Sequence, residues 1–290
     1  MSALSEGGVG LVAPGRGRGL LDVAQRRYLL NLLVRKELRV RYRGSVLGLG
    51  WSYVKPAVQF VVYFVALGLL LRQDTIGDYA VYLFGGLVVV TTFGEAVSNA
   101  TQSVVGNADL VKKIYLPREL FPVASLAVAG VHLVPQLAVL GIGSLAAGWR
   151  PDAVGLLALV AGLVLTALLA LGFGLLLAAV NVLFRDVENL VDLALMVVVW
   201  ATPVLYSWQR VQEVAADHPG LLALYQANPL TVAVELMHRG TWAGASPENM
   251  ASMPENLAVN TALAFAIAAA LVVVGQLVFH RLSGRFAQEL

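Results

Sequence analysis

The chain has 290 residues, of which 58% are hydrophobic and 13% are charged, with a formal net charge of +2. A soluble domain carries about 25% charged residues, so this composition predicts an all-α integral membrane protein. The chain has no cysteine, which excludes disulfides, thiolate catalysis and cysteine-based metal sites.

The first two predicted segments precede the membrane-spanning helices. Residues 1–20 lack the apolar core of a signal peptide and are predicted to form a flexible tail. Residues 21–45 are predicted to form a cytoplasmic amphipathic helix. Three arginines recur at every fourth position and therefore share one helical face: Arg35, Arg39 and Arg43. Apolar residues at the same spacing form a neighbouring face: Leu30, Val34 and Leu38.

Six intervals without charged residues predict six membrane-spanning helices, because a bilayer core takes about 20 mostly apolar helical residues. Their approximate bounds are 51–71, 79–100, 121–148, 153–182, 191–207 and 257–280. These spans would form one membrane domain over 46–281, followed by a cytoplasmic tail over 282–290.

Charge predicts the orientation of these spans. An even number of spans places both termini on one side, together with 16 of the 20 lysines and arginines. The remaining four fall on the opposite side: Arg72, Arg150, Arg210 and Arg239. The positive-inside rule therefore predicts a multi-pass protein of the cytoplasmic (inner) membrane with both termini in the cytoplasm.

The long external connection over 207–257 contains an apolar stretch that is interrupted at Asn228 and Pro229. Because proline removes a backbone donor, we expect short re-entrant or interfacial helices here and not a seventh span. An ordinary helical external loop fits the pattern equally well.

Two ionisable residues lie within or beside the spans. Glu95 belongs to a polar run at the inner end of the second span, which indicates either a wet, protein-packed end or a cytoplasmic vestibule. His132 lies within the third span, where we expect a neutral imidazole bonded to a helix carbonyl. A proton relay would need several carboxylates at mid-membrane depth, so proton-driven transport is disfavoured.

Motifs for chemistry are missing, but two loops suit docking. The sequence has no GxxxxGK[ST], HExxH or GxSxG, so it carries no phosphate-binding loop of its own. The loops over 107–121 and 181–192 each combine apolar residues with fixed charges. Each alone would suit a solvated turn; together they suggest surfaces for a cytoplasmic partner.

Four segments, in order, carry a family resemblance: RVRYRGSVLGLGWSYVKP, LVKKIYLPRELFPVAS, FRDVENLVDLALMVVVWATPVLY and NPLTVAVELMHRG. With them the chain resembles, from Leu29 to Phe286, the membrane subunit of polysaccharide-export ABC transporters of the Wzm and TagG type. The resemblance implies a six-span permease that forms a homodimer, binds two copies of a cytoplasmic ATPase and exports a glycan on a polyprenyl carrier. ATP and Mg would belong to the ATPase, and this chain would bind no cofactor, metal or nucleic acid.

The same resemblance suggests roles for individual residues. The N-terminal helix is similar to a gate helix, and the loop over 107–121 to a coupling helix that contacts the ATPase. Six residues of this loop are candidates for that contact: Asp109, Lys112, Lys113, Tyr115, Pro117 and Arg118. Arg185 and Asp186 lie where a second coupling contact would fall.

Two hypotheses concern the substrate. Four arginines would attract the pyrophosphate of the carrier, although membrane anchoring also explains them: Arg35, Arg39, Arg41 and Arg43. Three aromatic residues share a face of the first span and would stack on sugar rings, unless they pack on neighbouring helices or face lipid: Tyr53, Phe60 and Phe64.

Two other functions remain open. One is a permease for drug or natural-product export. The other is a membrane-embedded glycosyl or acyl transferase, which would need convergent carboxylates. The available cluster, Asp186, Glu188 and Asp192, suits the start of a helix, where acids complement the dipole. O-antigen, galactan and teichoic-acid-like polymers are all candidate substrates.

Overall fold

The computed structural model describes residues 19–71, 76–114 and 116–290. The predicted tail over 1–18 and the candidate Tyr115 lie outside these residues. All regular structure in the described ranges is helical. The helices are α1 (Leu20–Gln25), α2 (Arg27–Arg41), α3 (Trp51–Tyr63), α4 (Tyr79–Ser103), α5 (Ala108–Lys113), α6 (Leu120–Ala146), α7 (Ala153–Leu183), α8 (Val187–Val198), α9 (Trp208–Val214), α10 (Pro219–Ala227), α11 (Pro229–Thr241), α12 (Pro247–Ala251), α13 (Leu257–Ser283) and α14 (Phe286–Glu289).

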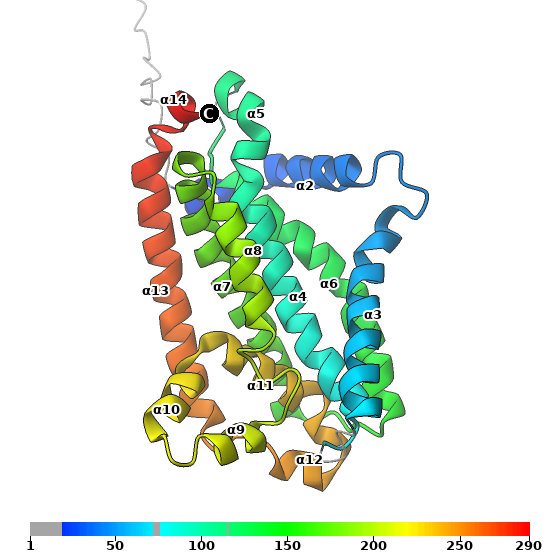
Figure 1. Cartoon of the computed structure of the whole chain (residues 1–290). Helices are drawn as coiled ribbons and strands as arrows, with labels where there is room; N and C mark the ends of the chain where they lie inside the picture. Colours follow the sequence, from blue (N-terminus) through cyan, green and yellow to red (C-terminus); the bar gives the residue numbers. More distant parts are fainter. Residues whose placement is uncertain (1–18, 72–75, 115) are drawn as a thin grey trace, which may run out of the picture.

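Five helices in the described part of the chain are long and apolar enough to cross a membrane. They are α4, α6, α7, α13 and α3 together with the π-helical turn η2 (Phe64–Leu70) that continues it. The molecule is therefore an all-helical, multi-pass membrane protein. Figure 1 shows them side by side, with α2, α5 and α14 at one end (the α5 end) and α9, α10 and α12 at the other (the α9 end).

Small residues allow the tightest helix contact, between α7 and α13. A Cβ atom added to Gly275 would lie 2.5 Å from the carbonyl oxygen of Gly172. One added to Gly172 would lie 2.8 Å from the Leu271 side chain. Helices in lipid lack the hydrophobic driving force that operates in water and associate mainly through van der Waals packing. The close approach of α7 and α13 provides such packing.

The predicted fifth span, 191–207, is not one continuous helix. Helix α8 has 12 residues, a length of about 18 Å at 1.5 Å per residue. It ends at Val198, and Pro203 disfavours its continuation because the proline ring cannot donate to the Val199 carbonyl and would clash with it. The irregular segment that follows is buried in the core through Val204 and Leu205. Its carbonyl groups are satisfied by α4: the Tyr79 hydroxyl donates to Leu205 at 3.2 Å, and the Tyr82 hydroxyl lies 2.9 Å from the carbonyl oxygen of Pro203.

The connection between α8 and α13 contains a helix that enters the bundle. Asn228 caps α11 by accepting from the Leu230 backbone N–H, and Pro229 occupies its first turn. Helix α11 packs against α4, α7 and α13, and most of its residues are buried, including the polar Glu235 and His238. Helices α9, α10 and α12 remain at the α9 end (Figure 1).

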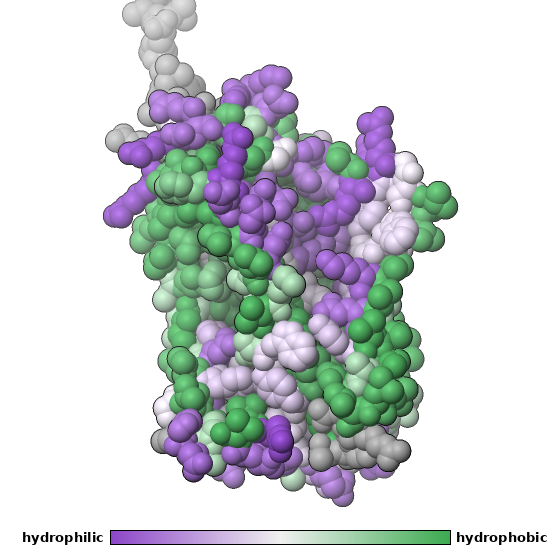
Figure 2. Space-filling model, viewed as in Figure 1, coloured by the Kyte–Doolittle hydropathy of each residue, from purple (hydrophilic) through white to green (hydrophobic). Residues whose placement is uncertain are grey.

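Helices α2 and α3 lie at the edge of this bundle. Helix α2 crosses the α5 end and packs on α6, with Leu33 buried. Gly44 and Gly48, at φ 77° and 51°, turn the chain from α2 toward α3. Helix α3 has no buried residue. Figure 2 shows an apolar band between two hydrophilic ends, and a hydrophilic strip that runs from the α5 end into the band beside α3.

Candidate functional site: a polar groove beside α3

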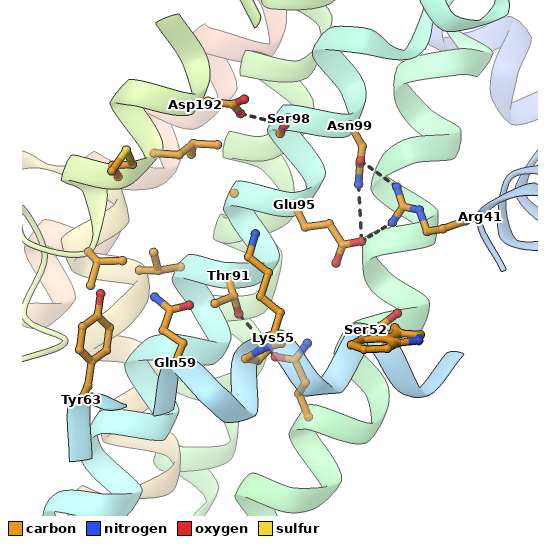
Figure 3. Close-up of a pocket in the computed structure, with 18 of the residues that line it drawn as sticks. Arg41, Ser52, Lys55, Gln59, Tyr63, Thr91, Glu95, Ser98, Asn99 and Asp192 are labelled. Atoms are coloured by element: carbon orange, nitrogen blue, oxygen red, sulfur yellow. Dashed lines mark hydrogen bonds and ion pairs between the residues drawn. The ribbon is translucent and has the colours of Figure 1, made fainter. Parts of the chain in front are cut away.

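The hydrophilic strip corresponds to a groove of about 900 Å³ between α3, α4, α6 and α8. Each wall contributes hydrogen-bonding side chains (Figure 3). Those from α3 and α4 are Ser52, Lys55, Gln59, Thr91, Glu95, Ser98 and Asn99; those from α6 and α8 are Gln136 and Asp192. The lining also contains apolar residues and four aromatic residues: Tyr42, Trp51, Tyr63 and Trp200.

Helical periodicity explains the α3 wall. Ser52, Lys55, Gln59 and Tyr63 recur three or four residues apart and therefore share one face of α3. Their side chains point toward α4 and α8 in Figure 3. The remaining faces of α3 carry exposed valines such as Val58 and Val62. This polar stripe within an apolar span is visible in the sequence, although only its aromatic neighbours were predicted to line the glycan path.

A chain of polar contacts closes the groove at the α5 end. The Arg41 guanidinium donates to the Glu95 carboxylate at 2.7 Å and to the Asn99 side-chain oxygen at 2.8 Å. His132 Nδ1 lies 2.7 Å from the same Glu95 oxygen, and His132 Nε2 lies 2.9 Å from the Tyr42 hydroxyl, which also contacts Ser52. Because an ionised carboxylate can only accept, Nδ1 carries the proton of the contact with Glu95.

The predicted hydrogen-bonding partner of His132, a helix carbonyl, was therefore wrong. Its ring binds Glu95 and Tyr42 instead of a helix carbonyl. A buried polar group needs a hydrogen-bonding partner, and α2 and α4 supply partners that cannot be identified from the α6 sequence alone. The contacts tie α2, α3, α4 and α6 together at the mouth of the groove.

The four candidate arginines separate into two groups. Arg41 lines the groove and forms an ion pair with Glu95. The other three lie exposed along and just after α2, outside the groove lining: Arg35, Arg39 and Arg43. The predicted basic face is thus available to a membrane surface or a headgroup, and Arg41 serves a different purpose.

The three candidate aromatic residues do not line the groove. Phe60 and Phe64 stack at 5.7 Å between ring centroids, and each ring also meets an aromatic residue of α4. Their partners there are Phe84, at 5.4 Å from Phe60, and Tyr79, at 6.4 Å from Phe64. Tyr53 is half-buried on α3. The aromatic residues that line the groove are Tyr42, Trp51, Tyr63 and Trp200.

The candidate ATPase contacts meet at the α5 end. Lys112 and Lys113 are exposed on α5, where Asp109 and Lys113 form an exposed ion pair at 3.6 Å. Pro117 and Arg118 follow in the half-buried loop before α6. Arg185 and Asp186 are exposed between α7 and α8. Figure 1 shows both segments at the same end of the bundle as α2.

Comparison with known proteins identifies the family. The family described as ABC-2 type transporter matches residues 28–240, a range that contains all four segments of the resemblance. An O-antigen export system permease protein RfbA of Klebsiella pneumoniae is 31% identical over 193 residues, which cover 64% of this chain and 73% of the relative. The protein of that name in Myxococcus xanthus is 32% identical over 196 residues, 67% of this chain and 74% of the relative.

These matches confirm the resemblance to polysaccharide-export permeases that the four segments indicated. A P-loop is absent from the sequence, as expected where ATP is hydrolysed by a separate subunit. The chain belongs to the ABC-2 type transporter family, and it is a membrane transport subunit and not an enzyme.

Proposed function

We propose that the chain is the membrane subunit of an ABC exporter that moves a polyprenyl-diphosphate-linked polysaccharide across the cytoplasmic membrane. The polymer would be an O-antigen, a galactan or a teichoic-acid-like glycan. A separate ATPase subunit would supply the energy and hold the ATP and Mg. This chain itself would need no cofactor.

The groove beside α3 is the observation that carries this proposal. Its hydroxyl, amide and charged side chains match the hydrogen-bonding groups of sugars, and its rings offer flat faces on which sugars stack. Pockets for drug-sized molecules are mostly apolar, with a few polar groups. Polar side chains on all four walls suit a glycan, and the similarity to O-antigen export permeases favours a glycan over a drug or natural product.

We further propose six membrane crossings with both termini in the cytoplasm. Helix α8 and the buried segment after it would form the sixth crossing, since irregular backbone is tolerated in a membrane where protein covers it. Helix α8 runs from the α5 end toward the α9 end in Figure 1. The excess of lysine and arginine in the segments of the α5 end supports a cytoplasmic position for that end.

The proposed assembly is a homodimer with two ATPase subunits. Exposed apolar side chains on α3 and α8, such as Val61 and Met196, flank the groove and would face the second copy. Two positions per chain would engage the ATPase. They are α5 with its following loop, including Lys112, and the turn at Arg185 and Asp186.

Export measured in a strain lacking this gene tests the proposal. The strain should accumulate lipid-linked glycan on the cytoplasmic side, and export should return only when the chain and its ATPase are both supplied. A transferase would retain turnover as a purified single chain, whereas a permease is inert without its ATPase. Turnover by the chain alone would contradict the proposal.

A role for the arginines of α2 in carrier binding needs a separate test. Neutralising Arg35 and Arg39 while keeping Arg43 leaves the groove contact of Arg41 intact. Loss of carrier-stimulated ATP hydrolysis with normal membrane insertion would support binding of the pyrophosphate. Normal stimulation would leave these residues as membrane anchors, each contributing about 1 kcal/mol of attraction to an anionic surface.

A further inference from the structure

Phe286 is fully buried although it lies four residues from the C-terminal residue of the chain. Within the predicted cytoplasmic tail over 282–290, Phe286–Glu289 form the short helix α14, which contacts α5 and α7. Figure 1 shows α14 beside α5. An aromatic side chain is buried by the residues that it packs against. The neighbours of Phe286 therefore indicate its role.

Some of those neighbours lie beside the proposed ATPase contacts. Phe286 meets Phe279 of α13 edge to face, with 5.3 Å between ring centroids. Both rings belong to an apolar cluster that also contains Val111 of α5 and Val182 of the last turn of α7. The C-terminal segment thereby packs on the two elements that carry the docking candidates.

Arg118 makes the most direct connection. Its guanidinium carbon lies 5.6 Å from the centroid of the Phe286 ring, within the range of a cation–π interaction. The next residue, Glu119, is buried and accepts a hydrogen bond of 3.3 Å from the Gln276 side chain of α13. The loop after α5 is therefore held at two consecutive residues by the C-terminal part of the chain.

We propose that Phe286 is a positioning residue for ATPase coupling, which acts through Arg118 to fix the orientation of α5. This inference rests on the proposed function, because it assumes that α5 and its loop contact an ATPase. Short helices such as α5, with 6 residues, are not stable alone in water. Its orientation must come from tertiary contacts, and α14 supplies one that does not involve the membrane.

Position can be measured directly because the chain has no cysteine. A spin label on Lys112→Cys in the full-length chain reports the mobility of α5. We expect Phe286→Leu, which keeps an apolar side chain but removes the aromatic face, to increase the mobility of the label. Gln288→Ala is the matched control, since Gln288 is exposed on the same short helix. Equal spectra for Phe286→Leu and the unchanged chain would overturn the proposal.

Coupling is measured as ATP hydrolysis by the ATPase at increasing concentrations of reconstituted permease. For Phe286→Leu, the concentration for half-maximal stimulation should rise about threefold to tenfold, the equivalent of one cation–π contact. Arg118→Met should give a similar rise, and Arg118→Lys, which keeps the cation, a smaller one. If Phe286 acts through Arg118, the double variant should be no worse than Arg118→Met; effects that multiply would contradict this path.

The proposed function and the positioning role of Phe286 can be disproved separately. If the unchanged permease does not stimulate any ATPase, the proposed function is wrong whatever Phe286 does. If the unchanged permease stimulates normally and Phe286→Leu matches it in both assays, the positioning role alone is wrong. Equal thermal unfolding of the two chains in detergent shows that a loss of coupling does not arise from misfolding.

Discussion

Arg239, in the last turn of α11, holds Asp152, the residue that caps α7, through two hydrogen bonds of 3.0 and 2.8 Å. Asp152 also accepts from the Gly155 backbone N–H at 3.3 Å. The ion pair thus joins the end of α11 to the start of α7, and bidentate pairing of this kind fixes geometry as well as charge.

This pair predicts a pH dependence of stability. The hydrogen bond from Arg239 lowers the pKa of Asp152 below its usual range. A lowered pKa in the folded state means that the stabilisation is complete above the unfolded pKa of about 3.9 and is lost as the pH falls through the folded pKa. Asp152→Asn, which keeps the cap, should lower the apparent melting temperature at pH 7, and the difference should close below about pH 4.

Melting curves of the two chains between pH 3 and pH 7 check this. The side chain of Asp152 is 46% exposed, so the difference at pH 7 should be small and should shrink in high salt. A gap that stayed constant at acid pH would show that the charge of Asp152 is irrelevant.

The Arg41–Glu95 contact should hold the α2–α3 connection in place. Glu95→Gln keeps the shape of the side chain and removes its charge, so the free energy of unfolding should fall by about 1–2 kcal/mol. Trypsin should also cleave faster between Arg41 and Lys55, because the connection loses its anchor on α4. Arg39→Gln, at an exposed position of α2, serves as the control and should behave like the unchanged chain.

The groove should matter more for export than the stacked phenylalanines. Tyr63→Leu combined with Gln59→Ala removes a ring and an amide from the groove lining, and we expect reduced glycan export with normal ATPase assembly. Val62→Ala, at an exposed position of α3 outside the groove lining, should export normally. Export in a time course after induction measures both.

The same assay tests the hypothesis that the glycan path includes Phe60 and Phe64. If these rings contact the glycan, Phe60→Ala with Phe64→Ala will lower export while assembly with the ATPase stays intact. Wild-type export in this double variant would remove them from the path. A loss of assembly would instead assign them to packing of α3 against Phe84 and Tyr79.

The contact of α7 with α13 should tolerate no added methyl group. Gly275→Ala places a Cβ 2.5 Å from a backbone oxygen, and overpacking of this kind costs about 1–3 kcal/mol. Gly141→Ala in α6 meets nothing within 4 Å and should be neutral or stabilise by about 0.5–1 kcal/mol. Thermal unfolding in one detergent compares the two; equal melting temperatures would show that the helices separate to admit the methyl group.

Local patterns predicted the long helices well and failed where distant residues decide the structure. Hydropathy placed α4, α6, α7 and α13 because each helix satisfies its own backbone. It treated 191–207 as one helix because nothing nearby shows that Tyr79 and Tyr82 receive the carbonyl groups of the broken part.

The arrangement of the groove could not be predicted from the sequence for a similar reason. Phe60 and Phe64 share a face, but only the position of α4 decides which face of α3 turns toward the groove. The buried position of Phe286 likewise depends on Val111 and Val182, which are remote in sequence. Glu95 and His132 stand out in the sequence as isolated ionisable residues. Their contacts with Arg41 and Tyr42, however, depend on the turn of the chain at Gly44.

Helix α3 contributes no residue to the buried core. The free energy needed to widen the groove therefore depends on the contacts that α3 makes with its neighbours. Swinging α3 outward between the turn at Gly44 and the π-helical end at Leu70 would break the contacts of Ser52 and the ring contacts of Phe60 and Phe64. The packed bundle of α4, α6, α7, α11 and α13 would remain intact. Widening the groove in this way would therefore cost the contacts of one helix and would leave the contacts within the packed bundle unchanged.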